Sequence, residues 1–374
     1  MKCHIYADNA ATTKLDTVAF EAMTPWLLEE YGNASQPYAF ARKPKKALAE
    51  ARTTIAECIG ALPEEIYFTS GGTESDNWVI KSSAFLDLDK RAMITSAFEH
   101  HAILHSCTVI ERLGYPVAYM WPTADGYITP EILEKYITGS TRIVSVMFAN
   151  NEIGTIQPIR ELCKVAHTHG ALFHTDAVQA VGHVKIDVHE LGVDFLSASA
   201  HKFNGPKGVG FLYIRKGVEL PPYADGGAQE NAHRAGTENI ASIIGMAAAL
   251  KANCDALEQN LQYISKLEHL LISMLDESEI AYRRNGGENR LPGLVSLSFP
   301  GKDGETILHR MDLMGISIST GSACDSVNTE ISHVLQAIML DEEHSKGTVR
   351  ISLGKNNTEA EAGRIAEALI RIIV

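Results

Sequence analysis

One lysine stands where a covalent bond to a cofactor could form. Lys202 lies in the run 199–210, which reads SAHKFNGPKGVG and directly follows an apolar stretch at 193–198 typical of a strand. A lysine at a strand end can form a Schiff base with pyridoxal phosphate, while neighbouring polar groups bind its phosphate. A surface loop with a solvated lysine is the alternative, because such glycine-rich loops are common. The segments described next distinguish a cofactor-binding lysine from a solvated surface lysine.

A second segment has the composition of an anion-binding helix start. The run 70–77 reads SGGTESDN and follows a strand-like stretch at 66–69. Small residues let backbone N–H groups approach an anion, and the dipole of the helix favours negative charge at its N-terminus. We interpret Gly72 and Thr73 as phosphate contacts, with an ordinary N-cap turn as the alternative.

Two more strand ends supply polar groups suited to a pyridine ring. Asp176 ends an apolar run, and a carboxylate there can pair with a protonated ring nitrogen. A helix N-cap is the alternative role for Asp176, and the two roles are compatible. Gln179 would reach the ring hydroxyl, and Asn151 ends a third strand near the same region. Since open α/β sheets bind ligands at the carboxyl ends of their strands, these segments converge on one site.

A histidine and a cysteine add candidate reactive groups. His100 follows a predicted strand, and its imidazole could stack on the ring and transfer protons near neutral pH. A solvent-facing position at a helix start fits His101 better than His100. Cys324 lies in the run STGSACDS at 319–326, which suggests a flexible loop, whereas Cys58 and Cys107 follow apolar helical spacing typical of a core. An exposed thiol on such a loop suits a nucleophile that enters a pocket and then leaves it.

The order of the predicted elements indicates an α/β fold with a largely parallel sheet. The strand-like runs are 65–69, 91–95, 142–148, 172–175, 195–198 and 209–214. Helical patterns lie between them at 44–59, 101–113 and 159–169. From about residue 240 a long helix rich in alanine and leucine runs towards 275, followed by apolar strands at 294–299 and 316–319 and a final helix from about 359. We expect a large domain with a smaller α/β domain packed on it.

Size and composition exclude several classes of protein. With 374 residues, 45% of them hydrophobic, the chain is long enough for a large core and two domains. A formal charge of −13 argues against a broad nucleic-acid-binding surface. No apolar run approaches the length of a membrane span, and the start of the sequence lacks the apolar core of a signal peptide. The six cysteines include no CxxC pair, so we expect a reducing, cytoplasmic location.

With both Lys202 and Cys324 in place, the chain resembles the cysteine desulfurases of the NifS/IscS type. These belong to the class V aminotransferase branch of the pyridoxal-phosphate enzymes of fold type I. The resemblance extends from DNAATT at 8–13 to RISLG at 350–354. It implies a large domain at 15–255, built on a mostly parallel seven-stranded sheet that binds the cofactor. Residues 1–14 with 256–374 would form the small domain, which includes the loop of the catalytic cysteine.

The resemblance also implies a reaction and roles for its residues. L-cysteine would be converted to L-alanine, with its sulfur left on Cys324 as a persulfide for delivery to an acceptor protein in iron–sulfur cluster assembly or thiolation. Lys202 would form the Schiff base and then remove the Cα proton, with His100 as a proton-exchanging ring contact. Arg350 would grip the substrate carboxylate, for which a bidentate guanidinium is suited, with Asn151 beside it. We expect no resident metal, with transient iron–sulfur ligation by Cys324 as the one exception.

A larger set would hold the cofactor in a homodimer. The implied contacts are Gly72, Thr73, His100, Asn151, Asp176, Gln179, Ser199, His201, Lys202 and Thr237. In such dimers the threonine that matches Thr237 comes from the neighbouring subunit. Asp325 departs from the Thr or Ser often found after the nucleophile, and its charge should raise the pKa of Cys324.

Three other functions remain as alternatives. A selenocysteine lyase or another class V enzyme could share nearly all these residues, whereas an aminotransferase would have no use for a loop cysteine. The third alternative is not a self-sufficient enzyme but a sulfur-relay subunit that is active only with a partner. Turnover of the purified protein, with and without acceptors, separates a relay subunit from a self-sufficient enzyme.

Overall fold

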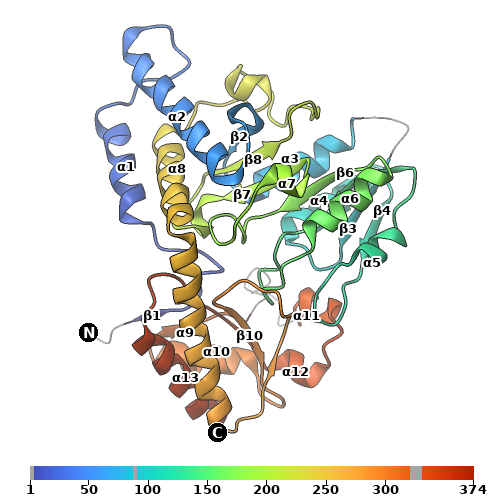
Figure 1. The fold of residues 1–374 in the computed structure, drawn as a ribbon, viewed down its shortest axis with the longest axis vertical. Helices are drawn as coiled ribbons and strands as arrows, with labels where there is room; N and C mark the ends of the chain where they lie inside the picture. The colour runs from blue at the N-terminus through green and yellow to red at the C-terminus, as the bar shows by residue number, and fades with distance from the viewer. Residues whose placement is uncertain (1–3, 87–90, 321–330) are drawn as a thin grey trace.

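A seven-stranded sheet forms the centre of the molecule (Figure 1). The computed structural model describes residues 4–86, 91–320 and 331–374, so the predicted nucleophile Cys324 lies outside the described residues. In spatial order the strands are β2 (Ile66–Thr69), β8 (Gly210–Ile214), β7 (Phe195–Ser199), β6 (Leu172–Asp176), β5 (Thr141–Ser145), β3 (Ala92–Ser96) and β4 (Val117–Met120). Within this sheet β8 runs antiparallel to both of its neighbours, and the other pairs are parallel. The expected mostly parallel sheet is therefore confirmed.

Helices cover the sheet and bury their apolar faces against it. They are α3 (Gly72–Ser83), α4 (His101–Arg112), α5 (Pro130–Glu134), α6 (Ile159–Thr168) and α7 (Val188–Leu191). In α6 the buried residues Ile159, Leu162, Cys163 and Ala166 follow the three- and four-residue spacing of one helix face. Cys107 of α4 is likewise fully buried, which confirms its prediction as a core residue.

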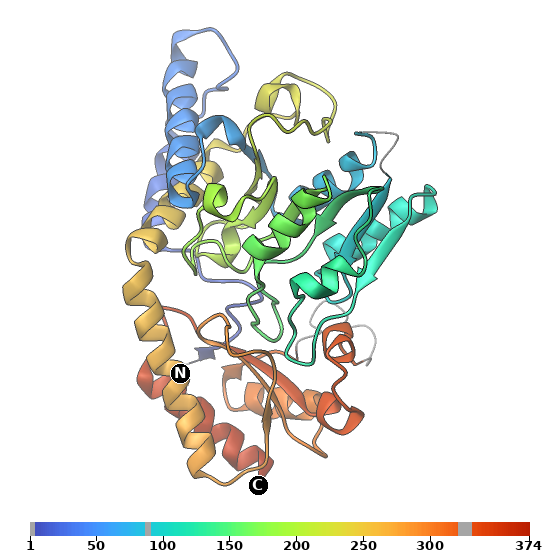
Figure 2. The same cartoon turned by 45° about the vertical axis from the view of Figure 1, so that its right-hand side comes forward.

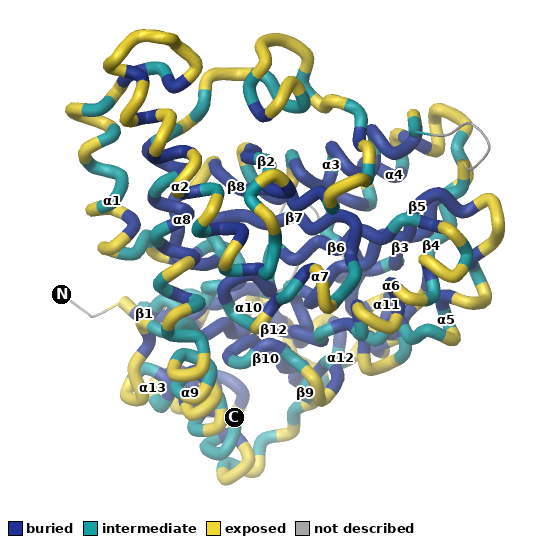
Figure 3. The backbone as a smooth tube through the Cα atoms, turned by 45° about the horizontal axis from the view of Figure 1, so that its top comes forward, coloured by how far each residue is buried: buried dark blue, intermediate teal, exposed yellow. Residues whose placement is uncertain are grey.

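Two N-terminal helices pack on the outside of the large unit. Both α1 (Thr17–Leu28) and α2 (Arg42–Ile59) contact α8 (Ile240–Asp255). Figure 3 shows that the sheet strands are buried, whereas much of α1 and the loop after it is exposed. Large side chains including Phe20, Leu28 and Tyr31 face outward there.

The single long helix predicted at 240–275 is instead two helices. The structure has α8 followed by α9 (Leu257–Glu277), bent by 73° at their junction. Ala256 leaves the helical region with ψ of 13°, which breaks the helix there. The bend lets α8 stay in the main core while α9 packs against α13 (Glu359–Ile373). In the described part of the chain no single helix is long and apolar enough to span a membrane, and this bent pair meets that test only when both helices are joined.

A second apolar core lies beyond the bend. Its elements form the lower part of the molecule in Figure 2. Its sheet has the order β12 (Thr348–Ser352), β10 (Leu294–Ser298) and β9 (Arg283–Arg284), and α9, α10 (Gly304–Leu313) and α13 add side chains to its core. The N-terminal β1 (Ile5–Tyr6) pairs with β11 (Ile316–Ser317) in this region. The domain division at 15–255 and at 1–14 with 256–374 stays a prediction, and Val334, Leu335 and Ala337 of the later segment pack in the main core. The remaining helices are α11 (His333–Ala337), α12 (Glu342–Lys346) and the short turns η1 (Ala39–Ala41), η2 (Pro63–Glu65), η3 (Ala200–Lys202) and η4 (Gln229–Ala232).

Candidate active site

A cavity of about 270 Å³ opens at the carboxyl ends of β3, β5, β6 and β7. The loops that follow these strands form most of its wall, as expected for an open parallel sheet. The lining residues are Ala10, Ala11, Gly72, Thr73, Asp76, His100, Met147, Ala149, Asn151, Asp176, Val178, Gln179, Ser199, His201, Lys202 and Arg350. Among the predicted site residues that the structure describes, all except Thr237 line this cavity, and Cys324 lies outside the described residues.

Lys202 is presented to the cavity by the turn η3 directly after β7. This turn is tight, since a Cβ at Gly205 would lie 2.8 Å from the Cβ of Ala200. The Nζ of Lys202 donates hydrogen bonds to the carbonyl oxygens of Ala10 and Ala11, the latter at 2.9 Å. The N-terminal segment therefore helps to hold the amine in the cavity.

Asp176, the last residue of β6, places a buried carboxylate at the same cavity. Its Oδ1 accepts the backbone N–H of Val178 at 2.9 Å, so the predicted capping role and a cavity-facing role coexist. Burial raises the pKa of Asp176 to about 6, opposed by the Val178 N–H and by the charge of Lys202. Gln179 donates its amide to the Ala10 carbonyl at 2.9 Å in this structure.

His100 is a neutral imidazole at the start of α4. Its Nδ1 accepts the backbone N–H of Ala102 at 3.1 Å, so Nε2 holds the ring proton. Burial, followed by the charge of Lys202, lowers the pKa of His100 to about 4. His101 is half-buried rather than simply solvent-facing, and its ring centroid lies 4.7 Å from that of His333.

A second hollow of about 370 Å³ adjoins the first at the start of α3. Gly72, Thr73, Ser199 and His201 line both. A Cβ at Gly72 would lie only 2.4 Å from Cγ2 of Val178, so the backbone here approaches the Asp176 loop as closely as glycine allows. The first amides of a twelve-residue helix, four hydroxyl groups and Lys207 line this hollow and form an anion-binding environment, and the Glu74 carboxylate that also lines it is paired with Arg234.

Arg350 enters the cavity from β12 and is held on two sides. Its Nη2 pairs with Asp8 at 2.8 Å, and its Nη1 donates to the Asn151 carbonyl at 3.0 Å. The side chain is only 3% exposed, and among the described residues its Nε has no hydrogen-bond partner. This oriented guanidinium, with an unsatisfied buried donor, suits a carboxylate ligand.

Thr237 does not reach the cavity of its own chain. It is exposed in the loop between η4 and α8. In the same loop Arg234 forms a bidentate pair with Glu74 of α3, at 2.7 and 3.1 Å. The loop is therefore fixed to the helix that begins at the anion site, with Thr237 turned outward.

The residues present fit pyridoxal phosphate. The cofactor requires an amine for its aldehyde, a carboxylate for its ring nitrogen and an anion site for its phosphate. Lys202, Asp176 and the Gly72 backbone supply these three groups around two contiguous hollows. Among the residues described, no group of three potential ligands has the geometry to hold a metal ion.

Asp76 is a second cavity carboxyl that the sequence reasoning did not select. It follows Gly72 by four residues on the same buried face of α3. This helical spacing could have predicted that Asp76 lies near the cavity. Its Oδ1 lies 3.7 Å from Nε2 of His174 and has no hydrogen-bond partner among the described residues. Burial, together with the charge of Asp176, raises the pKa of Asp76 well above its ordinary value.

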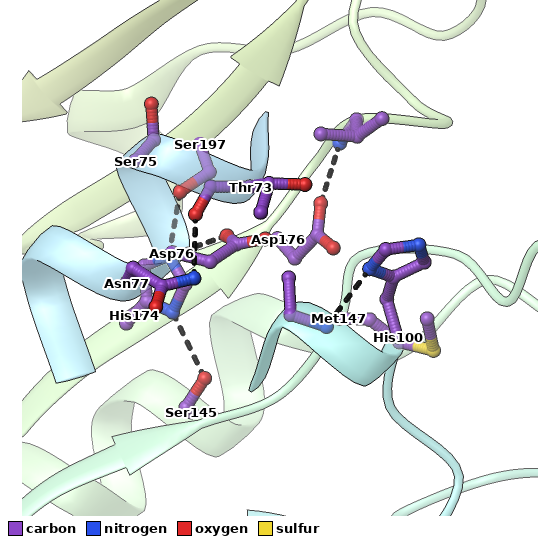
Figure 4. A network of polar contacts seen from close by, with 12 residues as sticks. Thr73, Ser75, Asp76, Asn77, His100, Ser145, Met147, His174, Asp176 and Ser197 are labelled. Carbon is purple, nitrogen blue, oxygen red and sulfur yellow. Dashed lines mark hydrogen bonds and ion pairs between the residues drawn. The ribbon is translucent and has the colours of Figure 1, made fainter. Parts of the chain in front are cut away.

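The strand register explains the polar network around Asp76. Ser145 of β5 pairs with His174 of β6, and Asp176 pairs with Ser197 of β7, so all four side chains share one sheet face. The two nitrogens of His174 lie 2.9 Å from the Ser145 hydroxyl and 3.0 Å from the Ser197 hydroxyl (Figure 4). Burial lowers the pKa of His174 to about 3, so this ring is neutral.

Glu99 is another buried carboxyl beside the cavity wall. The sequence did not predict a role for it, although it directly precedes His100. It is fully buried, and its Oε1 accepts the Ser96 hydroxyl at 2.5 Å and the Met147 N–H at 2.9 Å. Burial raises the pKa of Glu99 to about 8, with a contribution from Asp176. A protonated glutamic acid therefore lies directly behind His100.

Comparison with known proteins places the chain in a family. Residues 5–365 match the model of the family described as aminotransferase class V. A relative from Dictyoglomus turgidum, named cysteine desulfurase IscS, is 46% identical over 100% of this chain and 95% of its own. A solved structure described as a NifS-like protein has a TM-score of 0.93 at 36% identity and covers 99% of both chains. Another, described as SspA in complex with cysteine, has a TM-score of 0.84 at 35% identity over 95% of this chain and 100% of its own. The chain therefore belongs to the class V aminotransferase family, in which it is similar to the cysteine desulfurases.

Proposed function

We propose that this protein is a pyridoxal-phosphate-dependent cysteine desulfurase that converts L-cysteine to L-alanine and leaves the sulfur on Cys324 as a persulfide. One observation supports this most strongly: Lys202, Asp176, His100 and Arg350 line a single cavity that adjoins an anion site. These four positions provide an amine, a carboxylate, a neutral imidazole and a guanidinium around the space for one small amino acid and a ring. The names of the relatives agree with this chemistry.

Different side chains bind the substrate and transfer protons in this proposal. Pyridoxal phosphate, when bound, supplies an electron sink that makes the Cα–H of an attached amino acid acidic. Arg350 binds the substrate carboxylate, with its guanidinium oriented by Asp8 and by the Asn151 carbonyl. Nζ of Lys202 accepts the Cα proton, while Asp176 keeps its negative charge at neutral pH. His100 offers its Nε2 proton at the same cavity, since its Nδ1 is occupied by Ala102.

The sulfur transfer is balanced without an added oxidant. The thiolate of Cys324 attacks the substrate sulfur, so an S–S bond forms as the carbon–sulfur bond breaks. The electron pair of the broken bond stays with the substrate carbon, which takes up a proton to become the methyl group of alanine. Cys324 retains the transferred sulfur as a persulfide, which is then delivered to an acceptor protein of iron–sulfur cluster assembly or thiolation.

A second copy of the chain completes the site in this proposal. The exposed position of Thr237, outside its own cavity, agrees with a role in a neighbouring subunit. The outward side chains of α1 and the following loop also agree with a covering partner: Phe20 is 57% exposed, Leu28 73% and Tyr31 75%. A cytoplasmic location belongs to the same proposal, in which Cys58, Cys107, Cys163 and Cys254 are free thiols.

Release of alanine and sulfide from L-cysteine, with reductant, tests the proposal. We expect activity in the wild type and in Cys254→Ser, a half-buried control thiol, and its loss in Cys324→Ala. Equal activity in Cys324→Ala would refute persulfide formation and favour a lyase. Inactivity of the wild type in yellow, cofactor-loaded protein, even with candidate acceptors added, would refute the substrate assignment.

A further inference from the structure

Two wall segments of the cavity are joined into one unit by Asn150. The segment 98–101 includes His100, and the segment 150–153 includes Asn151. Nδ2 of Asn150 donates to the Phe98 carbonyl at 3.1 Å, and its Oδ1 accepts the N–H of Glu152 at 2.9 Å. Since Asn150 is completely buried, these bonds lie in a dry environment where they hold both segments together. We call the two segments the ring wall.

The ring wall is bonded from outside by the residue that caps α11. The Ser332 hydroxyl donates to Oε2 of Glu152 at 2.5 Å and accepts the N–H of Val334 at 3.1 Å. Ser332 is 4% exposed and Glu152 is 5% exposed. A hydroxyl bonded to a buried carboxylate is among the stronger hydrogen bonds in proteins. The start of α11 is thereby fixed to the segment that includes Asn151.

The next residue is bonded to the other wall segment. Nε2 of His333 donates to the Glu99 carbonyl at 2.9 Å, and its ring packs 4.7 Å from that of His101. Two consecutive residues therefore contact the neighbours of both predicted ring contacts, His100 and Asn151. The arrangement joins distant parts of the chain, because Ser332 and Glu152 are 180 positions apart and His333 and Glu99 are 234 positions apart.

The contact is supported by packing on the far side of α11. Although α11 comes late in the chain, its apolar residues Val334, Leu335 and Ala337 belong to the main core around the seven-stranded sheet. Arg350 meets the same wall from β12 through the Asn151 carbonyl. The ring wall is therefore held at several backbone and side-chain positions by parts of the chain that follow residue 320.

We propose that Ser332 and His333 are positioning residues, which hold the ring wall so that His100 and Asn151 face the cofactor space at a fixed distance. The proposal deepens the proposed function and rests on it for the identity of the bound ring. Neither Ser332 nor His333 is among the described residues that line the cavity. They act on it through Glu152 and through the Glu99 carbonyl. Loss of the Ser332 bond loosens the wall and shifts His100 relative to the ring.

Hydrogen exchange measures the wall directly in the cofactor-loaded protein. We expect amides in 98–101 and 150–153 to exchange on the order of tenfold faster in Ser332→Ala than in the wild type. Glu152→Gln, which keeps an accepting oxygen at this position, should give a smaller increase, and the double variant should be less than additive. Ser345→Ala is the matched control, because that serine is also buried but donates only to the Leu340 carbonyl.

Visible absorbance separates positioning from simple support. We expect the pH titration of the bound cofactor's absorbance to shift in Ser332→Ala and His333→Ala and to stay unchanged in Ser345→Ala. Unchanged wall exchange, or an equal change in the control, would overturn the proposal, as would a loosened wall with wild-type absorbance. A wild type that releases no alanine while its wall responds as expected would refute the proposed function and leave the positioning role supported.

Discussion

Replacement of Glu99 by glutamine should make the protein less sensitive to rising pH. Glu99 is fully buried, and its Oε1 already accepts the Ser96 hydroxyl and the Met147 N–H. Burial is the main cause that raises the pKa of this carboxyl from 4.5 to about 8. Glutamine has nearly the same shape and keeps the accepting oxygen, but it has no proton to lose. The substitution therefore removes the titration and preserves the contacts.

The sign and the size of the effect follow from these two pKa values. Below pH 4.5 the carboxyl is protonated in both the folded and the unfolded protein, so stability does not depend on this group. As the pH rises towards 8, the unfolded chain loses its proton while the folded protein keeps it, and stability falls. At about 1.4 kcal/mol for each pH unit, the loss between pH 5 and pH 8 is about 4 kcal/mol.

Urea unfolding followed by circular dichroism at pH 5 and pH 8 measures this difference. Between these pH values the wild type should lose about 4 kcal/mol more unfolding free energy than Glu99→Gln. Glu342→Gln serves as control, because Glu342 lies exposed on α12 and its replacement should leave the profile close to that of the wild type. Parallel pH profiles for the wild type and Glu99→Gln would show that Glu99 is ionised in the folded protein and would refute the reasoning.

Three further substitutions test individual contacts. Gly72→Ala should weaken pyridoxal phosphate binding at least about tenfold, because its Cβ meets Val178, and Val178→Ala in the same chain should restore part of the affinity measured by fluorescence titration. Arg350→Lys should raise the KM for L-cysteine by about ten- to a hundredfold with an unchanged cofactor spectrum, since a bidentate contact is lost; a changed kcat with constant KM would contradict this role. Asp76→Asn should keep cofactor affinity within about twofold, because burial and the charge of Asp176 raise the pKa of Asp76 and so disfavour its ionised form; a large loss would show that its negative charge is needed.

The sheet and the position of the cavity could be predicted from local patterns. Short apolar runs that end in polar or glycine-rich segments mark buried parallel strands, and their carboxyl ends meet at one edge. Lys202, Asp176 and Asn151 each follow such a run, which is why the structure brings them to one cavity. The strand β4 was not predicted: its four residues are apolar, but the run is short and lies between Pro116 and Pro122, which are signals of turns and loops.

Other features depend on contacts between distant residues and left no local signal. The break between α8 and α9 occurs at Ala256, a strong helix former, because the two helices pack on different cores. The protonated state of Glu99 follows from burial by its surroundings in the folded protein. The Ser332 contact joins residues 180 positions apart, so only the folded chain reveals it.

The ion pair between Asp8 and Arg350 has a consequence for the timing of biosynthesis. Its partners are 342 positions apart, yet they lie 2.8 Å from each other at the edge of the cavity. All seven strands of the large sheet leave the ribosome long before Arg350 does, and domains begin to fold during synthesis. A nascent chain can thus form the sheet while the cavity wall that includes Arg350 has not yet been made. Chains that terminate before β12 would keep Lys202 and Asp176 and lack the guanidinium, so with the role proposed for Arg350 newly made protein would bind L-cysteine only after the last steps of translation.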